Sequence, residues 1–484
     1  TIPVVTSPAY NGTGLVTTGI VSLSSGTIAS LNVQSGTTTA AALTVNTTAD
    51  VAGTLILTGD NSVSGNLTVT GSLTSTSGDL ILGAGLTLPT VAGSFTANSG
   101  TIRFTGTDVQ IVNPGMNGAA ANAFNVIDIA KTGGSITFIT NPLTAATLTQ
   151  GDTGAVGITF NQNLTVTNVV TFNTSGTVTL GDNAADIFIF NDGISHTIAA
   201  HTRNTTLYGT LRTSDDVITL DNVILGSDSI IRSLDAAGAA VTVNGTITGG
   251  GYNLALISGS ETTTVSGNAS NLGTVTLQNG TASGAVSFDG NFEAETLTTY
   301  GGNHNISFTG DATTVTNAVS FNNTGNLILG DNAADVCTFN GGVTHTAGDT
   351  TLRGRLQTSN DAVTLQNLTL GTDSEISTGN GLIEINGSIT GGGNALALVS
   401  GSGTTTVSGD AAGLGAVTLQ SDIAGATGAV SFGGSLTAAS ITTYTRAYDI
   451  SFTGDATTVT NAVTFSNTGN LILGDNAADV CTFN

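Results

Sequence analysis

Six aspartates occur in pairs within a short motif that the chain carries three times. The motif GDNAAD begins at Gly181, Gly330 and Gly474, and each copy places two carboxylates four positions apart. The six acids are Asp182, Asp186, Asp331, Asp335, Asp475 and Asp479. Carboxylates bind Ca²⁺, and two of them set a few ångströms apart on one face cleave glycosidic bonds. A pair that recurs in every copy is more simply a turn, because Asn and Asp side chains hydrogen-bond their own backbone. We therefore expect structural turns, no catalytic residue and no cofactor, with weak Ca²⁺ association as the alternative.

The histidines and cysteines follow the same repeats. The four histidines, which show no metal-ligand spacing, are His196, His201, His304 and His345. His196 and His345 each lie fifteen residues after the start of a GDNAAD motif, so they are equivalent positions. Cys337 and Cys481 are also equivalent, and Phe188 takes that place in the first copy. Because a position that accepts Phe is a core position, and free Cys behaves as a small buried hydrophobe, we expect these cysteines in the core.

Two arginines lie beside an apolar strand. Arg353 and Arg355 have Tyr208 and Thr210 as their counterparts in the first copy. We expect these positions to lie on the solvated face of a strand.

Composition excludes several classes of protein. Charged residues are 8% of 484 positions, against about 25% in ordinary soluble domains. Hydrophobic residues are 39%, in short bursts, and Pro occurs only five times, which argues against disorder. The net charge of −24 argues against nucleic acid partners and against docking on anionic lipid. No apolar run of about 20 residues is present, so no transmembrane helix is expected.

Long tandem repeats organise the chain. Residues 307–340 and 451–484 are identical except at two positions, and the two blocks are 144 residues apart. An older copy lies upstream, because the GDNAAD motifs are spaced by 149 and then by 144 residues. The segment from His196 to Leu211 is four residues longer than the equivalent segment from His345 to Leu356. This difference predicts a loop insertion in the first copy.

These repeats predict the domain organisation. We expect a diverged section over 1–157 that caps the solenoid or forms an interface, one copy over 158–306, a second over 307–450, and the start of a third over 451–484. Because the third copy stops within its unit at Asn484, the sequence predicts a longer parent protein. The least regular stretch, Gly115 to Lys131, is expected to form a short helix or a longer loop.

The fine rhythm inside each repeat predicts an all-β fold, a β-solenoid. Val363 and Leu365 share one face of a strand, and so do Leu368 and Leu370. Coils of about 20–25 residues would give about six coils per repeat. Stacked in register, they would enclose a narrow apolar core, with Thr, Ser and Asn outside, Asn ladders at turns and Gly at corners. Rows of immunoglobulin-like sandwiches fit less well, because Trp is absent and Pro does not occur after Pro142. A propeller is disfavoured by the repeat length.

Several segments resemble a known class of surface protein. The segments GNLTVTGSLT, GTVTL, AVTLQNLTLG and GGSITF are similar to the passenger regions of bacterial autotransporter and filamentous-haemagglutinin type adhesins. The resemblance implies a right-handed parallel β-helix, export across the bacterial envelope, and a role in attachment or in a surface layer.

Together these features predict an extracellular structural or adhesive fibre on a bacterial surface, and not an enzyme. Its expected partners are other copies of itself and glycans or proteins of a host or cell surface. One alternative is a filament subunit that assembles head to tail. A second is a β-helix that binds or degrades carbohydrate.

Overall fold

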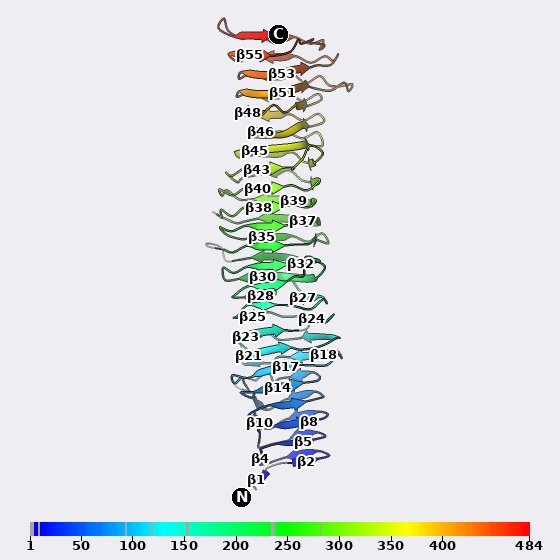
Figure 1. Cartoon of the computed structure of the whole chain (residues 1–484), viewed down its shortest axis with the longest axis vertical. Helices are drawn as coiled ribbons and strands as arrows, with labels where there is room; N and C mark the ends of the chain where they lie inside the picture. The colour runs from blue at the N-terminus through cyan, green and yellow to red at the C-terminus, as the bar shows by residue number, and fades with distance from the viewer. Residues whose placement is uncertain are drawn as a thin grey trace. The chain divides into compact units, whose positions relative to one another are not determined.

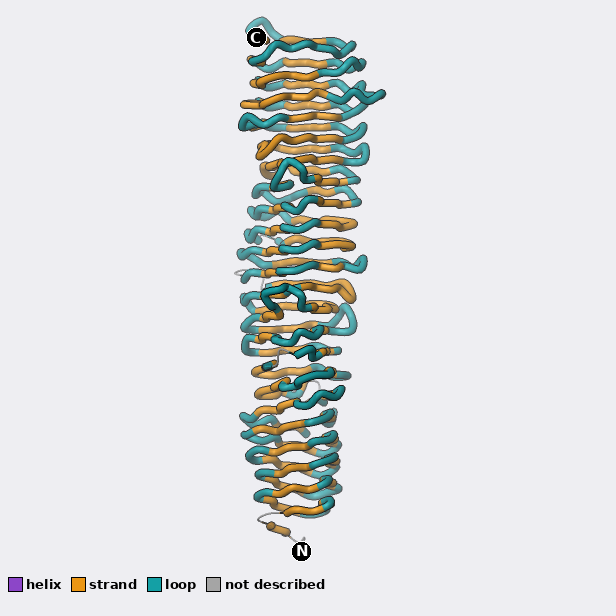
Figure 2. The backbone as a smooth tube through the Cα atoms, turned by 45° about the vertical axis from the view of Figure 1, so that its right-hand side comes forward, coloured by secondary structure: helices purple, strands orange, loops and turns teal. Residues whose placement is uncertain are grey.

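The computed structural model describes residues 4–7, 10–91, 94–117, 120–151, 154–233, 238–280 and 282–484. Every regular element in these ranges is a β-strand and none is a helix (Figure 2). Accordingly, the described residues contain no helix that is long and apolar enough to cross a membrane. The chain divides into two compact units, Thr1–Leu234 and Asp235–Asn484, here called unit 1 and unit 2.

Unit 1 is a stack of coils whose ladders are formed by strands that pair in parallel with strands one coil later (Figure 1). One such ladder starts with β3 (Leu15–Thr17), β6 (Leu31–Val33), β9 (Ala49–Val51) and β12 (Leu67–Val69). Its register pairs Leu15 with Leu31, Leu31 with Ala49, and Ala49 with Leu67, so these coils hold only 16 to 18 residues. The predicted parallel solenoid is confirmed, but its first coils are shorter than expected.

The segment from Gly115 to Lys131 corrects the sequence prediction. Its described residues, 115–117 and 120–131, contain neither a helix nor a long loop, because β21 (Ala123–Ile129) pairs in parallel with β17 (Thr101–Phe104) and β23 (Leu143–Gln150). Just before β21, β19 (Met116–Asn117) and β20 (Ala120–Ala121) form a short antiparallel pair. The strand forms because its apolar side chains extend the core, where Phe124, Ile127 and Ile129 are buried.

Unit 2 has three parallel ladders per coil, and its longest strands turn corners without a break. β45 (Val343–Gln357) and β46 (Val363–Ser377) each contribute to all three ladders. One ladder joins these residues in order: Ile306, Leu327, Thr350, Leu368, Ile389, Ala411 and Leu436. Its steps give coils of 18 to 25 residues within the uninterrupted range 282–484.

The 144-residue repeat does not equal a whole number of coils. Ile306 begins β40 (Ile306–Phe308), and its counterpart Ile450 begins β54 (Ile450–Phe452). Leu436 lies six coils after Ile306 on the same ladder. From Leu436 the chain passes Ile441 on the second ladder and reaches Ile450 on the third, which adds two thirds of a coil. Ile450 therefore pairs with Val430, on a different ladder from its counterpart. One repeat spans six coils and two thirds, so equivalent segments occupy different faces.

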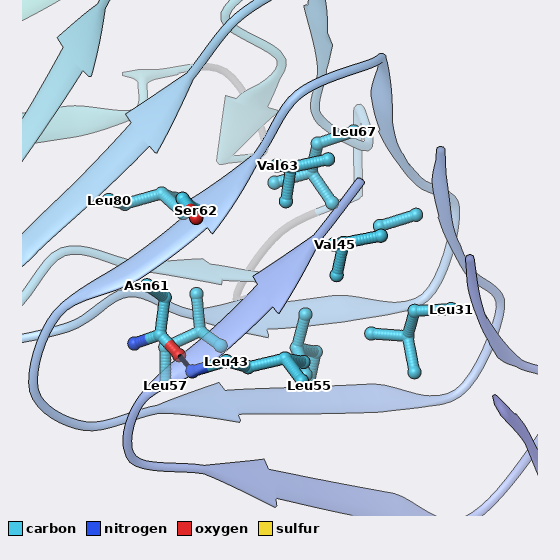
Figure 3. A pocket seen from close by; sticks show the side chains of 11 residues that line it. Leu31, Leu43, Val45, Leu55, Leu57, Asn61, Ser62, Val63, Leu67 and Leu80 are labelled. Atoms are coloured by element: carbon cyan, nitrogen blue, oxygen red, sulfur yellow. Dashed lines mark hydrogen bonds between the residues drawn. The ribbon is translucent and has the colours of Figure 1, made fainter. Parts of the chain in front are cut away.

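The core confirms the predicted alternation. Val363 and Leu365 are fully buried, and Thr364 between them points outward. Phe288 and Phe308, one coil apart, stack with ring centroids 5.5 Å apart and planes within 6°. In unit 1, leucine and valine side chains leave a space of only about 10 Å³, no larger than one water molecule (Figure 3). That part of the interior has no room for a ligand.

Replacing a stacked core ring tests this packing. The substitution Phe308→Ala removes a fully buried side chain and is expected to cost about 3–5 kcal/mol in local unfolding free energy. Because each coil contacts only its neighbours, amide hydrogen exchange should accelerate most in β40 and in its partners β38 (Val286–Phe288) and β43 (Leu327–Leu329). The outward Ser307→Ala is the matched control. Equal acceleration along the whole of unit 2 would contradict local packing.

Candidate functional site

The aspartate motif folds into a hydrogen-bonded turn. In the second copy, Asp335 Oδ2 accepts the backbone N–H groups of Asp331 at 2.7 Å and Asn332 at 3.1 Å. The Asn332 amide nitrogen donates to Asp331 Oδ1 at 2.8 Å and to Asp335 Oδ1 at 2.6 Å. The Ala334 N–H donates to Asn332 Oδ1 at 2.9 Å. The polar side chains of the motif therefore hold its own backbone.

The other two copies repeat this arrangement. Asp186 Oδ2 accepts the N–H groups of Asp182 and Asn183 at 3.0 and 3.1 Å. Asp479 Oδ2 accepts the N–H of Asp475 at 2.7 Å, and this donor leads the hydrogen bonds that hold the pKa of Asp479 below its usual range. Since donors to a carboxylate favour its charged form, the turn of the third copy favours ionised Asp479.

The turn also fixes the next coil. The carbonyl of Asp335 accepts the N–H of Arg355 at 2.8 Å, and the carbonyl of Asp186 accepts the N–H of Thr210 at 2.8 Å. Gly330 opens the turn with φ +79, in the left-handed region that favours glycine. The motif thus sets where the following strand pairs.

The same geometry limits metal binding. Within the described ranges, His, Cys, Asp and Glu side chains form no group of three or more that could hold a metal ion. Each turn offers two aspartates, and one carboxylate already accepts the turn's N–H groups, whereas Ca²⁺ takes six to eight oxygen ligands. The six aspartates lie as three separate structural turns, and the structure supplies no complete coordination shell around any of them.

Two equivalent histidines are built into the core. The Nδ1 atoms of His196 and His345 lie 2.9 Å from the hydroxyl oxygens of Thr205 and Thr350, respectively. Each ring also meets a phenylalanine edge to face, at 6.0 Å for Phe172 and 6.1 Å for Phe321. Burial lowers the pKa of His196 to about 4 and lowers the pKa of His345. Both side chains are therefore neutral packing groups near pH 7.

The four-residue insertion of the first copy forms a charged corner. Its turn is held by Asp221, whose buried Oδ2 accepts the Ile198 N–H at 2.9 Å and whose Oδ1 lies 3.1 Å from His201 Nδ1. The buried Arg203 guanidinium donates to the carbonyls of Phe172, Thr197 and Asn173 at 2.7–2.8 Å. The insertion length was visible in the sequence, but this pairing of Asp221 with the inserted turn was not predicted.

The remaining predicted residues behave as core or corner groups. Cys337 is buried, as predicted, and burial raises the pKa of its thiol to about 12. His304 is also buried, with Nδ1 3.2 Å from the carbonyl oxygen of Ala282. Cys481, in contrast, is partly exposed. It lies in β57 (Val480–Phe483), the last strand of the structure, which has a paired strand on one side only, so the prediction of a core position is correct for Cys337 and wrong for Cys481. Across the described residues, the structure does not bring the predicted Asp, His and Cys side chains together into one site.

Three comparisons, with family models, with curated proteins and with solved structures, found no match to this chain.

The aspartate turn yields a test that separates a turn from a cation site. Asp335→Ala removes the acceptor of two backbone N–H groups and is expected to cost about 1–3 kcal/mol locally, measured by hydrogen exchange. A chelator should leave the thermal midpoint of the wild-type chain unchanged. Asp331→Ala, which leaves those two acceptor bonds in place, is the control. A midpoint that falls on chelation would favour Ca²⁺.

The buried histidine predicts a pH dependence. Because the pKa of His196 is about 4 when folded and about 6.5 when unfolded, its contribution to stability is complete above pH 6.5. That contribution falls as the pH drops towards 4, since the unfolded chain then binds the proton first. Between pH 7 and 4.5 the loss should be about 2 kcal/mol in local unfolding free energy, measured by hydrogen exchange.

The control variant is His196→Leu, since Leu220 occupies the next coil of the same ladder. This variant should lack the His196 part of the pH dependence. A wild-type curve and a variant curve that run parallel over this range would contradict the assignment.

Proposed function

We propose that this chain serves as an extracellular structural or adhesive fibre on a bacterial surface, and not as an enzyme. One observation carries the proposal: the side chains most able to take part in catalysis or metal binding instead stabilise the stacked coils. Asp335 fixes a turn, His345 packs against Phe321, and Cys337 is buried in the ladder. A protein whose Asp, His and Cys side chains stabilise turns and core is suited to mechanical and display roles.

The outward faces support a display role. In unit 1 one outward ladder includes four threonines in successive coils, Thr137, Thr159, Thr179 and Thr206, between Ile111 and Ile224. In unit 2 another includes Thr351, Thr369 and Thr390. Such rows offer closely spaced hydroxyl groups on a rigid backbone, and short side chains lose little conformational entropy on contact. These faces suit contact with glycans, with proteins, or with another copy of the chain.

Coil stacking supports a structural role. Stability in a solenoid is close to a sum over neighbouring coils, so copies can be added without enlarging a single core. The near-identical blocks at 307–340 and 451–484 fit growth by duplication. The resemblance to bacterial adhesin passenger regions is the basis for proposing export and a bacterial surface.

The proposal is tested by imaging together with an attachment assay. Electron microscopy of the purified chain should show thin particles of uniform width, and beads coated with the chain should be retained on cell-surface glycans or proteins more than bare beads. Compact particles without retention would contradict the proposal. Release of reducing sugar from a polysaccharide panel would favour the enzyme alternative, and fragmentation of long filaments in dilute denaturant would favour head-to-tail assembly.

A further inference from the structure

A surface cleft of about 260 Å³ lies at one corner of unit 2, where three successive coils meet. Ser377 and Asn380 line it from the first coil, Val399 from the next, and Ser421, Ile423 and Ala424 from the third. The register gives the order of the coils, because Ser377 at the end of β46 pairs with Val399 at the end of β49 (Leu396–Val399). We call this hollow the corner cleft.

The loop that contributes the third coil's residues is fixed from the coil after it. Arg446 Nη2 donates to the carbonyl of Asp422 at 2.7 Å and lies 3.1 Å from Asp422 Oδ1. Within the loop, the Ala426 N–H donates to the carbonyl of Ile423 at 3.2 Å. These contacts hold Ile423 at the cleft although 68% of it is exposed, the highest value among the large apolar side chains described in unit 2.

Two corner glycines keep the cleft open. Gly379 and Gly401 both line it, and each lies two residues after one of the paired residues Ser377 and Val399. Their φ angles are +65 and +58, so any other residue would be strained at either position. A Cβ on Gly401 would also lie 1.9 Å from the carbonyl oxygen of Gly379. The corner therefore stays bare of side chains.

The cleft combines aliphatic surface with neutral polar groups. Val399, Ile423 and Ala424 supply the aliphatic part, and Ser377 and Ser421 supply hydroxyl groups. Neither hydroxyl takes part in the hydrogen bonds found among the described residues. None of the residues that line the cleft carries a charge or an aromatic ring. A ligand that fits this lining is neutral and has an apolar group beside polar ones.

The amide of Asn380 is oriented by its neighbours. Its Nδ2 atom donates to Asn360 Oδ1 at 2.8 Å, and its Oδ1 atom accepts the N–H of Ser402 at 3.2 Å. These two bonds fix which end of the amide is the nitrogen, and they use one of the two Nδ2 hydrogens. The second N–H is then a donor for a ligand carbonyl.

We infer that the corner cleft binds one neutral N-acetylhexosamine residue of a glycan. An acetamido group combines a methyl group with an N–H and a C=O, which matches aliphatic side chains set beside hydroxyls and an amide donor. A sugar with hydroxyl groups alone offers its C–H face, which packs best on an aromatic ring, and the cleft has none. Its volume lies below the roughly 300–1,000 Å³ of sites that enclose drug-sized ligands, so it holds a single sugar unit. The inference rests on the proposed adhesive function and names the class of partner.

Other classes of ligand fit the cleft less well. A peptide that adds a strand needs an unpaired strand edge, and β46, β49 and β51 (Ala411–Leu419) each have paired strands on both sides. An anionic ligand would be repelled by the net charge of −24. The cation nearest the loop, Arg446, is already paired with Asp422.

The first copy has a different loop at the equivalent corner. Residues 278–284 form a loop two residues shorter than residues 420–428, and the shorter loop contains no large apolar residue. Both loops are closed by the same hydrogen bond, from a glutamine Nε2 to a glycine carbonyl at 2.7 Å. Because the closure is shared, the short loop can be grafted into the second copy.

Two positions around the loop differ as well. Gly302 takes the place of Arg446 in the first copy, so the guanidinium that fixes the longer loop is missing there. Arg232 takes the place of Ser377, so a long charged side chain replaces a hydroxyl group at the cleft. These differences assign the site to the second copy and not to the first.

The repeat supplies matched variants. In the loop graft, residues 421–427 are replaced by the first-copy sequence NGTAS together with Arg446→Gly, and Ser377→Arg likewise installs a first-copy residue. Ile423→Ser removes the exposed apolar side chain of the cleft, and Val169→Ser makes a similar change at an exposed position in unit 1 as the control. Circular dichroism checks that each full-length variant remains folded.

Binding is measured by saturation-transfer NMR and calorimetry with N-acetylglucosamine and N-acetylgalactosamine, and with glucose and glucosamine for comparison. The wild-type chain should bind at least one N-acetylated sugar with a Kd of about 1 mM and should bind glucose and glucosamine more weakly. Ser377→Arg and the loop graft should each weaken binding by about tenfold or more. Ile423→Ser should weaken it by about fivefold, and Val169→Ser should leave it unchanged.

Three results would overturn the inference: no wild-type binding of either N-acetylated sugar, equal binding of glucose, or binding that is indifferent to the loop graft. Retention of wild-type beads on glycans without binding of N-acetylated sugars would remove this site and leave the adhesive function standing. Absence of both retention and sugar binding would remove both.

Discussion

The in-register parallel hydrogen bonding between coils is the constraint on which the rest of the structure depends. Each inward side chain must stack on the inward side chain of the next coil, as Phe288 does on Phe308. Any extra residue must therefore be absorbed at a corner, because a one-residue slip within a strand would turn its apolar face to solvent. The GDNAAD turn and the register shift between β30 (Asn204–Thr213) and β32 (Asn222–Arg232) are two ways of meeting that requirement, and both leave the flanking ladders paired.

The same constraint explains the role of the few charged side chains in this chain. Corners leave carbonyl groups that no strand can reach, and buried cations satisfy some of them. Lys131 Nζ donates to the carbonyl of Asp108 at 2.7 Å, and the Arg203 guanidinium donates to three carbonyls. Conversely, the Asp221 carboxylate accepts a corner N–H group, that of Ile198. Since unpaired buried polar groups are costly, these rare charged side chains stabilise corners that a regular ladder cannot.

Local patterns in the sequence predicted the side-chain environment well and the pairing of coils less well. The alternation at Val363 and Leu365 and the exchange of Phe188 for Cys337 both pointed correctly to the core. Asn380 donates to Asn360 at 2.8 Å, as the predicted amide ladders require. The short first coils and the corner cleft beside Ile423 were missed, because corner length decides which strands meet. Corner length depends on contacts between residues about 20 positions apart, which alternation along one strand does not encode.

The mismatch between the 144-residue repeat and the coil has a consequence for geometry. Because one repeat spans six coils and two thirds, identical segments of successive copies are turned by a third of a revolution about the solenoid axis. An array of such copies is therefore a screw, and it returns to its starting orientation after three copies, or twenty coils. A feature that occurs once per copy is then distributed evenly around the axis. Such an array therefore presents each repeated feature in three directions around its axis.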